Sequence, residues 1–176
     1  FINLELSRDM GILLVGNASK PGIYTLPGGS NVLTLLHAAG GISEMGSYRS
    51  ILHKRGNKTI QIIDLYDVLV NGNLLFKYPL RSGDAVVVGP SQKMVSISGG
   101  INVPAIYELT ENENLDDLIT IAQGLSLSAS KEINLLKSSG ELETIQNAMT
   151  SSTKLFNGDS VIIPLFKPKN KKIYTV

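Results

Sequence analysis

Apolar residues recur with helical spacing in two segments of the chain, and the second segment repeats the first after 83 positions. The segments are residues 31–41 and 114–124. Spacing of three and four residues places the apolar side chains on one helix face, which packs on a core. The repeated positions are Val32, Leu35, Leu36 and Ala39 in the first segment and Leu115, Leu118, Ile119 and Ala122 in the second.

Both predicted helices have matching start and stop signals. Asn31 and Asn114 occupy N-cap positions, where the side-chain oxygen accepts a hydrogen bond from an amide of the first turn. Gly41 and Gly124 follow the last apolar residues, where a positive φ is favoured. The two helices are therefore expected to begin and end at equivalent residues.

Strand patterns surround each helix in the same order. The segments "ILLVG" and "GIYTL" precede the first helix, and "VSISG" and "AIYEL" precede the second. After the helices come two hairpins, "SILHKR" with "KTIQIID" around Gly56–Asn57, and "INLLK" with "ELETI" around "SSG". Short helical turns are expected at "LYDVLV" and "IQNAM". Both halves end in a Gly–Asp turn and an apolar run, "AVVV" or "SVII", as expected for a central strand.

Each copy therefore reads β-β-α-β-β-(short α)-β, with the last strand returning to the middle of the sheet beside the first. This order predicts an α+β fold of two tandem β-grasp (ubiquitin-like) domains, each a mixed sheet wrapped on one main helix. We expect the domains at residues 1–90 and 91–166. Residues 167–176 are expected to form a linker, and their "KIYTV" could begin a further repeat. The alternative, two unrelated α+β domains, does not explain the matching stripes, caps and closing turns.

The composition of the chain argues against several classes of binding partner and kinds of site. The 176 residues include 16 Lys and Arg against 15 Asp and Glu, so no strong field favours nucleic acid. The absence of cysteine excludes disulfides, thiol nucleophiles and Cys-based metal sites. No apolar run reaches the length of a membrane-spanning helix. Because the chain opens on Phe1 inside a strand-like segment, we expect it to be part of a longer protein.

Catalytic and cofactor motifs are missing from the sequence. His37 and His53 belong to no metal-ligand cluster, and no nucleophile elbow, P-loop or dinucleotide fingerprint occurs. Gly28 and Gly29 precede a helix start, but the second copy has an acidic segment there, so we interpret them as turn residues. The sequence predicts no enzyme, no cofactor and no metal.

One polar segment is a candidate binding surface. "EMGSYRSILHKR" combines an aromatic ring with several hydrogen-bond donors, and its candidate ligand-binding residues are Tyr48, Arg49, His53 and Arg55. Such a mixture could hold a sugar or contact a neighbouring subunit. It could equally be a polar sheet edge that keeps the strand soluble.

The chain resembles a known family in three successive stretches of the first half. These are "VGNASKPGIYTLPGGSNVLTLLHAAGGISEMGSYRSILHKR", "IDLYDVL" and "LRSGDAVVVGP", and "SGGINVPAIYELTENENLDDLITIAQGL" resembles the following repeat. Over residues 1–166 the chain is similar to the tandem SLBB (soluble-ligand-binding β-grasp) domains of outer-membrane polysaccharide export proteins, which serve capsule and exopolysaccharide secretion in Gram-negative bacteria. Pro21–Gly22 matches the family's turn, whereas the second copy has Pro104–Ala105.

The resemblance implies a non-enzymatic periplasmic segment of a ring-forming export protein that is associated with the outer membrane. Expected partners are further copies of the chain, other components of the export machinery and the polysaccharide. Contact with the membrane is expected only through parts outside this chain. The alternative hypothesis is a module that binds a soluble oligosaccharide or small molecule around Tyr48, Arg49, His53 and Arg55.

Overall fold

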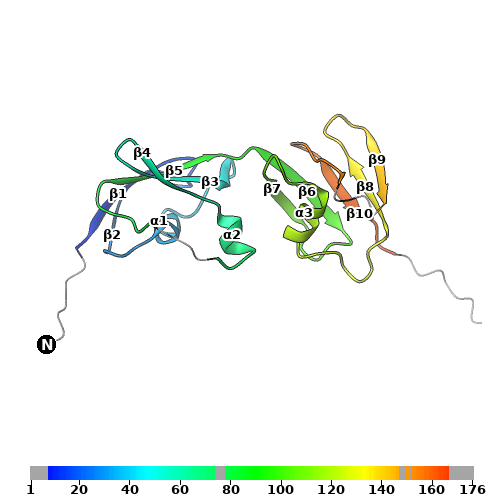
Figure 1. Cartoon of the computed structure of the whole chain (residues 1–176), viewed down its shortest axis with the longest axis horizontal. Coiled ribbons are helices and arrows are strands. Elements are labelled where there is room, and N and C mark those ends of the chain that lie inside the picture. Colours follow the sequence, from blue (N-terminus) through cyan, green and yellow to red (C-terminus); the bar gives the residue numbers. More distant parts are fainter. Residues whose placement is uncertain (1–7, 74–77, 147–149, 151, 167–176) are drawn as a thin grey trace, which may run out of the picture. The chain divides into compact units, whose positions relative to one another are not determined.

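The computed structural model describes residues 8–73, 78–146, 150 and 152–166, and the chain divides into two compact units, Phe1–Ser91 and Gln92–Val176 (Figure 1). Each unit contains one five-stranded mixed sheet and one main helix, so the predicted α+β class is confirmed. The linker and further strand expected at residues 167–176 lie outside the described residues.

The first unit has the predicted order of elements. They are β1 (Met10–Gly16), β2 (Gly22–Leu26), α1 (Val32–Ala38), β3 (Gly46–Arg55), β4 (Lys58–Ile63), α2 (Leu65–Leu69) and β5 (Asp84–Pro90). The strand order in the sheet is β2-β1-β5-β3-β4. Strand β5 is parallel to β1 and antiparallel to β3, as the β-grasp prediction required.

The second unit repeats this topology. Its elements are β6 (Lys93–Gly99), β7 (Ala105–Leu109), α3 (Leu115–Ile121), β8 (Glu132–Leu136), β9 (Leu142–Gln146) and β10 (Ser160–Ile163). The strand order is β7-β6-β10-β8-β9, with β10 parallel to β6 and antiparallel to β8. Of the helical turn expected at residues 145–149, the first two residues belong to β9, and residues 147–149 lie outside the described part of the chain.

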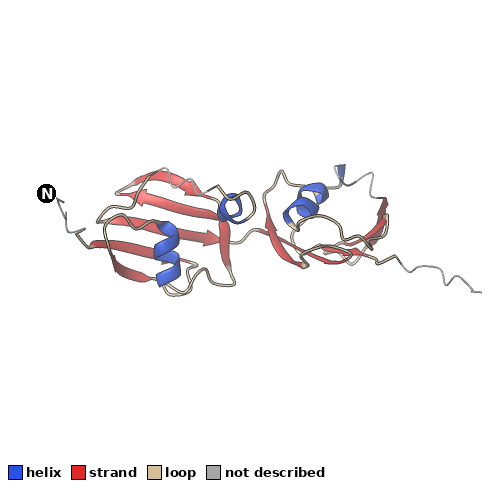
Figure 2. Cartoon of the chain, turned by 90° about the horizontal axis from the view of Figure 1, so that it is seen from below, coloured by secondary structure: helices blue, strands red, loops and turns tan. Residues whose placement is uncertain are grey.

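The main helix of each unit lies against one face of its sheet, as Figure 2 shows for α1. All eight apolar residues of the two predicted stripes are buried. The strand residues that face the helices complete two separate cores. They include Ile12, Leu14, Ile51, Val86 and Val88 in the first unit and Val95, Ile97, Ile133, Val161 and Ile163 in the second.

Both predicted N-caps are confirmed. The Oδ1 atom of Asn31 accepts a hydrogen bond of 3.0 Å from the amide of Thr34. Asn114 accepts hydrogen bonds from two amides of the first turn of α3, and Asp117 accepts the amide of Asn114 in return, which completes a capping box. Gly41 and Gly124 have φ values of 91° and 84°, so the predicted positive-φ residues also close the helices.

A close backbone approach occurs at the end of the first strand of each unit. Gly16 and Gly99 have φ values of 81° and 86°. A Cβ atom on Gly16 would overlap the carbonyl oxygen of Val88, and one on Gly99 would overlap that of Ile163. The same Val88 carbonyl accepts the amide of Asn17 at 2.9 Å. Only glycine readily adopts this φ and, because it lacks a Cβ atom, also leaves room for the backbone of the neighbouring parallel strand.

We expect Gly16→Ala to lower the free energy of unfolding of the first unit by roughly 3 kcal/mol, because it adds both a positive-φ strain and a backbone overlap. Urea unfolding, followed through the backbone NMR signals of each unit, measures the change. The matched control is Gly22→Ala, since Gly22 has open space around its Cβ position and the second unit carries Ala105 there. Equal effects of the two substitutions would contradict this interpretation of Gly16.

Candidate functional site

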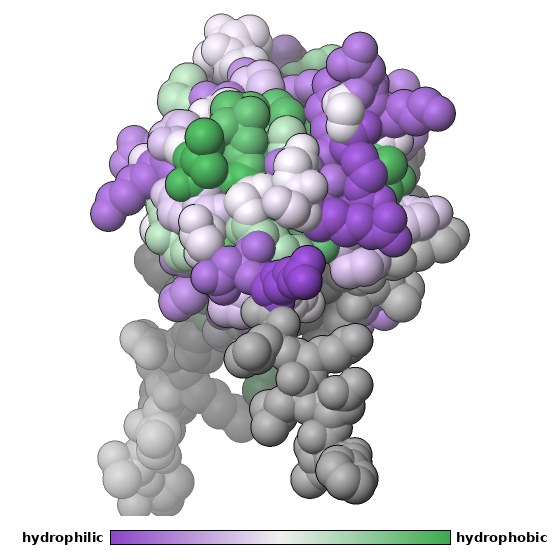
Figure 3. Space-filling model, turned by 90° about the vertical axis from the view of Figure 1, so that its left-hand side faces the viewer, coloured by the Kyte–Doolittle hydropathy of each residue, from purple (hydrophilic) through white to green (hydrophobic). Residues whose placement is uncertain are grey.

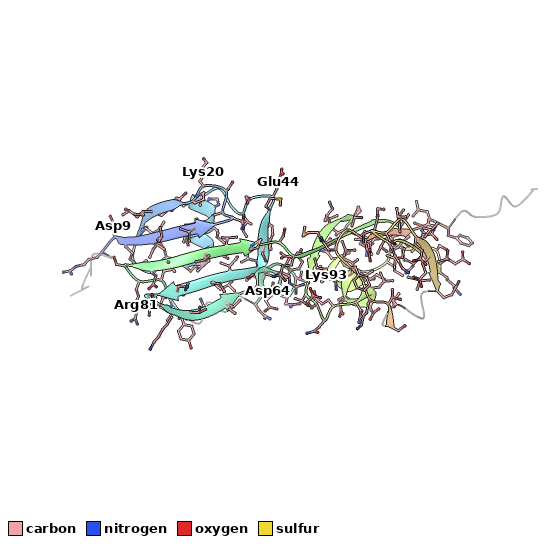
Figure 4. All side chains as sticks on the ribbon, turned by 90° about the horizontal axis from the view of Figure 1, so that it is seen from above. Asp9, Lys20, Glu44, Asp64, Arg81 and Lys93 are labelled. Carbon is pink, nitrogen blue, oxygen red and sulfur yellow. The ribbon has the colours of Figure 1, made fainter. Side chains whose placement is uncertain are left out.

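The four candidate ligand-binding residues lie on one strand, β3, but the structure separates them into two pairs. Tyr48 and Arg49 lie near the start of the strand, and His53 and Arg55 lie at its end. At about 3.3 Å per residue, Tyr48 and Arg55 are roughly 20 Å apart along the strand. Figure 4 labels Asp64 and Arg81, which neighbour the two pairs, at opposite ends of the first sheet. The four side chains therefore do not converge on one ligand.

His53 and Arg55 bind a buried carboxylate, Asp84. The Nε2 atom of His53 lies 2.7 Å from Oδ2 of Asp84, and both side chains are completely or almost completely buried. Arg55 donates from Nε to Oδ1 at 2.7 Å and from Nη2 to Oδ2 at 2.8 Å. The amide of Arg81 donates to Oδ2 at 2.8 Å. We call His53, Arg55, Asp84 and the Arg81 amide the Asp84 cluster.

The Asp84 cluster keeps its carboxylate ionised. Burial by itself would raise the pKa of Asp84, but the hydrogen bonds from Arg55, His53 and the Arg81 amide outweigh burial and lower this pKa to about 2. An ionised carboxylate only accepts hydrogen bonds, so Nε2 of His53 carries the proton that it shares with Asp84. Three donors from β3 and the Gly–Asp turn thus fix the end of β3 to the start of β5.

The second unit satisfies the equivalent carboxylate in a different way. Asp159 accepts the amide of Ser138 at 2.9 Å and that of Phe156 at 2.8 Å. Leu135, which pairs with Val161 in the ladder, takes the place of His53. Lys137 replaces Arg55 and forms ion pairs with two glutamates instead. Because the turn persists without the imidazole or the guanidinium, we interpret the Asp84 cluster as part of the framework.

Arg49 also has protein partners. Its Nε donates to Oδ2 of Asp64 at 2.9 Å, and its guanidinium lies over the Tyr66 ring, 4.6 Å from the centroid. Asp64 in turn caps α2 by accepting the amide of Tyr66 at 2.9 Å. Arg49 therefore joins β3 to α2. Tyr48 remains partly exposed, and ligand binding by these four residues stays a prediction.

Other candidate chemistry can be placed as well. His37 is exposed on α1, as its position outside the apolar stripe predicted. In the part of the chain that the structure describes, no cluster of three or more His, Asp or Glu side chains is arranged to hold a metal ion. Within those same residues, no helix has the length and apolar character that crossing a membrane requires.

The role of Asp84 could be predicted from the sequence only as a turn residue. The signal is the "GD" pair at the end of both copies, which places an acidic residue at the first position of a strand that must be buried. His53 and Asp84 are 31 residues apart, and their contact depends on the pairing of β3 with β5. In the sequence, neither His53 nor Asp84 by itself indicates that the two side chains are in contact.

Comparison with known proteins agrees with this architecture. The model of the SLBB domain family matches residues 13–63 and 94–146. The chain belongs to the SLBB domain family. Each match begins in the first strand of a unit and ends with its second hairpin, so the two matched segments correspond to the two repeated units. The predicted family resemblance is confirmed.

Two curated relatives are similar to almost the whole chain. Both are polysialic acid transport protein KpsD of Escherichia coli, and each is 29% identical to the chain over 171 residues. The similar stretch covers 93% of this chain and 30% of each relative. The chain therefore spans about a third of the length of these relatives.

The Asp84 cluster predicts an acid-dependent stability of the first unit. The folded-state pKa of Asp84, about 2, lies below its usual 3.8, so the unfolded chain binds the proton first as the pH falls. The stabilisation is complete above about pH 4 and is lost as the pH falls toward 2, by about 2 kcal/mol in total. Urea titrations followed through first-unit NMR signals at several pH values measure it.

The control for this prediction is Asp84→Asn, which keeps the shape of the side chain but cannot titrate. The variant is less stable at neutral pH, because Arg55 and His53 lose the charge of their acceptor. Its stability should fall less steeply than that of the wild type between pH 4 and pH 2. Parallel curves for the two proteins would show that Asp84 is not the titrating group.

Proposed function

We propose that the chain is a non-enzymatic, periplasmic segment of a polysaccharide export protein, in which the tandem units make protein contacts within an assembly of several copies. The observation that carries the proposal is the similarity to KpsD, a polysialic acid transport protein, over 93% of the chain. This stretch includes both SLBB units. In the full-length protein we place the segment near the outer membrane, with other export components as additional partners.

The contacts of the buried ionisable side chains support a structural role for the chain. Asp84 and Asp159 hold their turns, and His53 donates to Asp84. The ammonium of Lys93 donates to the carbonyl oxygens of Thr110 and Glu113 at 3.1 and 2.9 Å. A catalytic acid, base or nucleophile needs a reacting group within reach. These buried groups contact the framework of their own unit instead.

The outer face of the first sheet, opposite α1, supports contact between copies. Strand residues that alternate with the core residues point outward here, and the ladder register aligns them in rows across the strands. We call this surface the apolar sheet face. Its apolar residues are Leu13, Val15, Ile23, Leu52, Ile62, Ala85 and Val87. Lys54, which pairs with Ala85, ends the row that contains Ile23 and Leu13.

Several residues of the apolar sheet face are largely exposed to solvent. Ile23 is 79% exposed, Ile62 is 67% exposed and Leu13 is 41% exposed. Figure 3 shows a hydrophobic area, in green, among hydrophilic residues in purple. Contiguous apolar surface of this kind is typical of protein interfaces. A neighbouring copy is the occupant that the assembly proposal requires.

The corresponding face of the second sheet has a polar centre. Ser96 and Ser160 lie side by side on β6 and β10, and their hydroxyl groups are hydrogen-bonded at 2.8 Å. Ile106, the repeat equivalent of Ile23, is 64% exposed but pairs with Ser96. The two units therefore share a fold while only the first has an apolar row through the centre of the outer face.

We expect the full-length protein to form an oligomer that Ile23→Asp weakens by about tenfold or more, because the substitution places a charge in the proposed contact. Ile106→Asp is the matched control and should leave the oligomer intact. Light scattering and native mass spectrometry over a range of concentrations measure the assembly. A wild-type protein that remains monomeric throughout, or an equal effect of the two substitutions, would contradict the proposal.

A further inference from the structure

Two hollows in the second unit share one exposed aromatic residue in their lining. One has a volume of about 380 Å³ and the other about 350 Å³, and Lys154 and Phe156 line both. The first hollow is also lined by Gln92, Lys93, Glu111 and Asn157. The second is also lined by Lys137, Glu143, Thr144 and Thr153. Each hollow falls in the size range of sites for small ligands.

The backbone holds Phe156 in place at the Gly–Asp turn. Its amide donates to Oδ2 of Asp159 at 2.8 Å, and its carbonyl accepts the amide of Asp159 at 3.1 Å. The preceding residue, Leu155, is buried in the core, and the side chain of Asn157 accepts the amide of Met94 at 2.9 Å. As a whole residue, Phe156 is 62% exposed. A fixed turn thus presents an aromatic ring to solvent.

The equivalent residue of the first unit is Arg81, whose amide makes the same contact with Asp84. The turn therefore does not require an aromatic side chain at this position. Burial in the core does not explain the ring of Phe156 either, because most of it is accessible. An exposed aromatic side chain with neither role is a candidate contact for a ligand.

The surroundings of Phe156 fit a sugar better than a protein surface. The residues around the ring supply amides, hydroxyl groups and charges, whereas the centre of a protein interface is depleted of charges. A sugar ring has an apolar C–H face that can pack on an aromatic ring, and hydroxyl groups at its rim that need hydrogen-bond partners. Two hollows that share Phe156 and Lys154 in their lining would accommodate successive units of one glycan chain.

Lys154 indicates the charge of the ligand. Lys93 donates to two backbone carbonyls, and Lys137 lies 3.1 Å from both Glu141 and Glu143. For the exposed Lys154, in contrast, the structure shows no ion pair among the residues it describes. Lys154 lines both hollows, and an ammonium group can pair with a carboxylate.

From these observations we propose that the second unit binds an oligosaccharide of carboxylated sugars, with one sugar ring packed on Phe156 and a sugar carboxylate near Lys154. We call this place the Phe156 site. The inference rests on the proposed function in polysaccharide export and adds to it a point of direct contact with the glycan. It also moves the expected ligand contact from β3 of the first unit to the closing turn of the second.

The test is an NMR titration of the isotope-labelled chain with short oligomers of sialic acid and, separately, with neutral maltooligosaccharides of the same length. Sialic acid oligomers should shift the amide signals around Phe156, Lys154 and Asn157 with an affinity in the millimolar range. Phe156→Ala should weaken binding of the acidic oligomers about tenfold or more. Lys154→Gln should weaken binding several-fold and abolish the preference for the acidic over the neutral glycan.

Phe166→Ala is the control, since Phe166 is an exposed phenylalanine of the second unit that lines neither hollow. Its effect on glycan binding should be negligible. Absence of shifts at the Phe156 site, or equal binding by wild type and Phe156→Ala, would overturn the inference. If the amide signal of Phe156 shifts with protein concentration in the absence of glycan, Phe156 is a protein contact and the inference of a glycan site is overturned. The assembly state of full-length Phe156→Ala is a separate measurement, so failure of glycan binding leaves the oligomer proposal to its own test.

Discussion

The last strand of each unit pairs with the first strand in the middle of the sheet, and this pairing organises the other elements. β5 and β10 enter between strands that the chain has already placed, parallel to β1 and β6. Parallel neighbours cannot be joined by a tight turn, so the helix and the second hairpin lie between them in sequence. The closing strand is buried on its helix side and must begin abruptly, which places the Gly–Asp turn and its carboxylate at the edge of the core.

This constraint explains which parts of the fold could be predicted from the sequence. The apolar stripes, the Asn caps and the Gly56–Asn57 loop are local signals, and the structure confirms each of them. Gly16 and Asp84 depend on residues that become neighbours only after the last strand is inserted, such as Val88 and His53. Their residue types are visible in the sequence, but their roles are not.

The candidate ligand-binding site on β3 shows the same limit of prediction from the local sequence. Tyr48, Arg49, His53 and Arg55 are close in sequence and rich in donors, yet a strand extends by about 3.3 Å per residue and separates them. Arg49, His53 and Arg55 are held by partners within the first unit. The two repeats agree in their closing turns and cores. They differ in the outer sheet face and in the residue two positions before the closing Gly–Asp pair, which is Arg81 in the first unit and Phe156 in the second. We propose that the functional contacts of the chain are made by the surfaces that differ between the two units.

Cysteine cross-linking can detect the contact that we propose between the apolar sheet face and another copy of the chain. The chain contains no cysteine, so a single thiol can be introduced without competition from this segment. In the assembled full-length protein, Ile62→Cys should form cross-links between copies, whereas His37→Cys, on the exposed side of α1, should not. Cross-links through position 37 and none through position 62 would show that copies do not meet through the apolar sheet face.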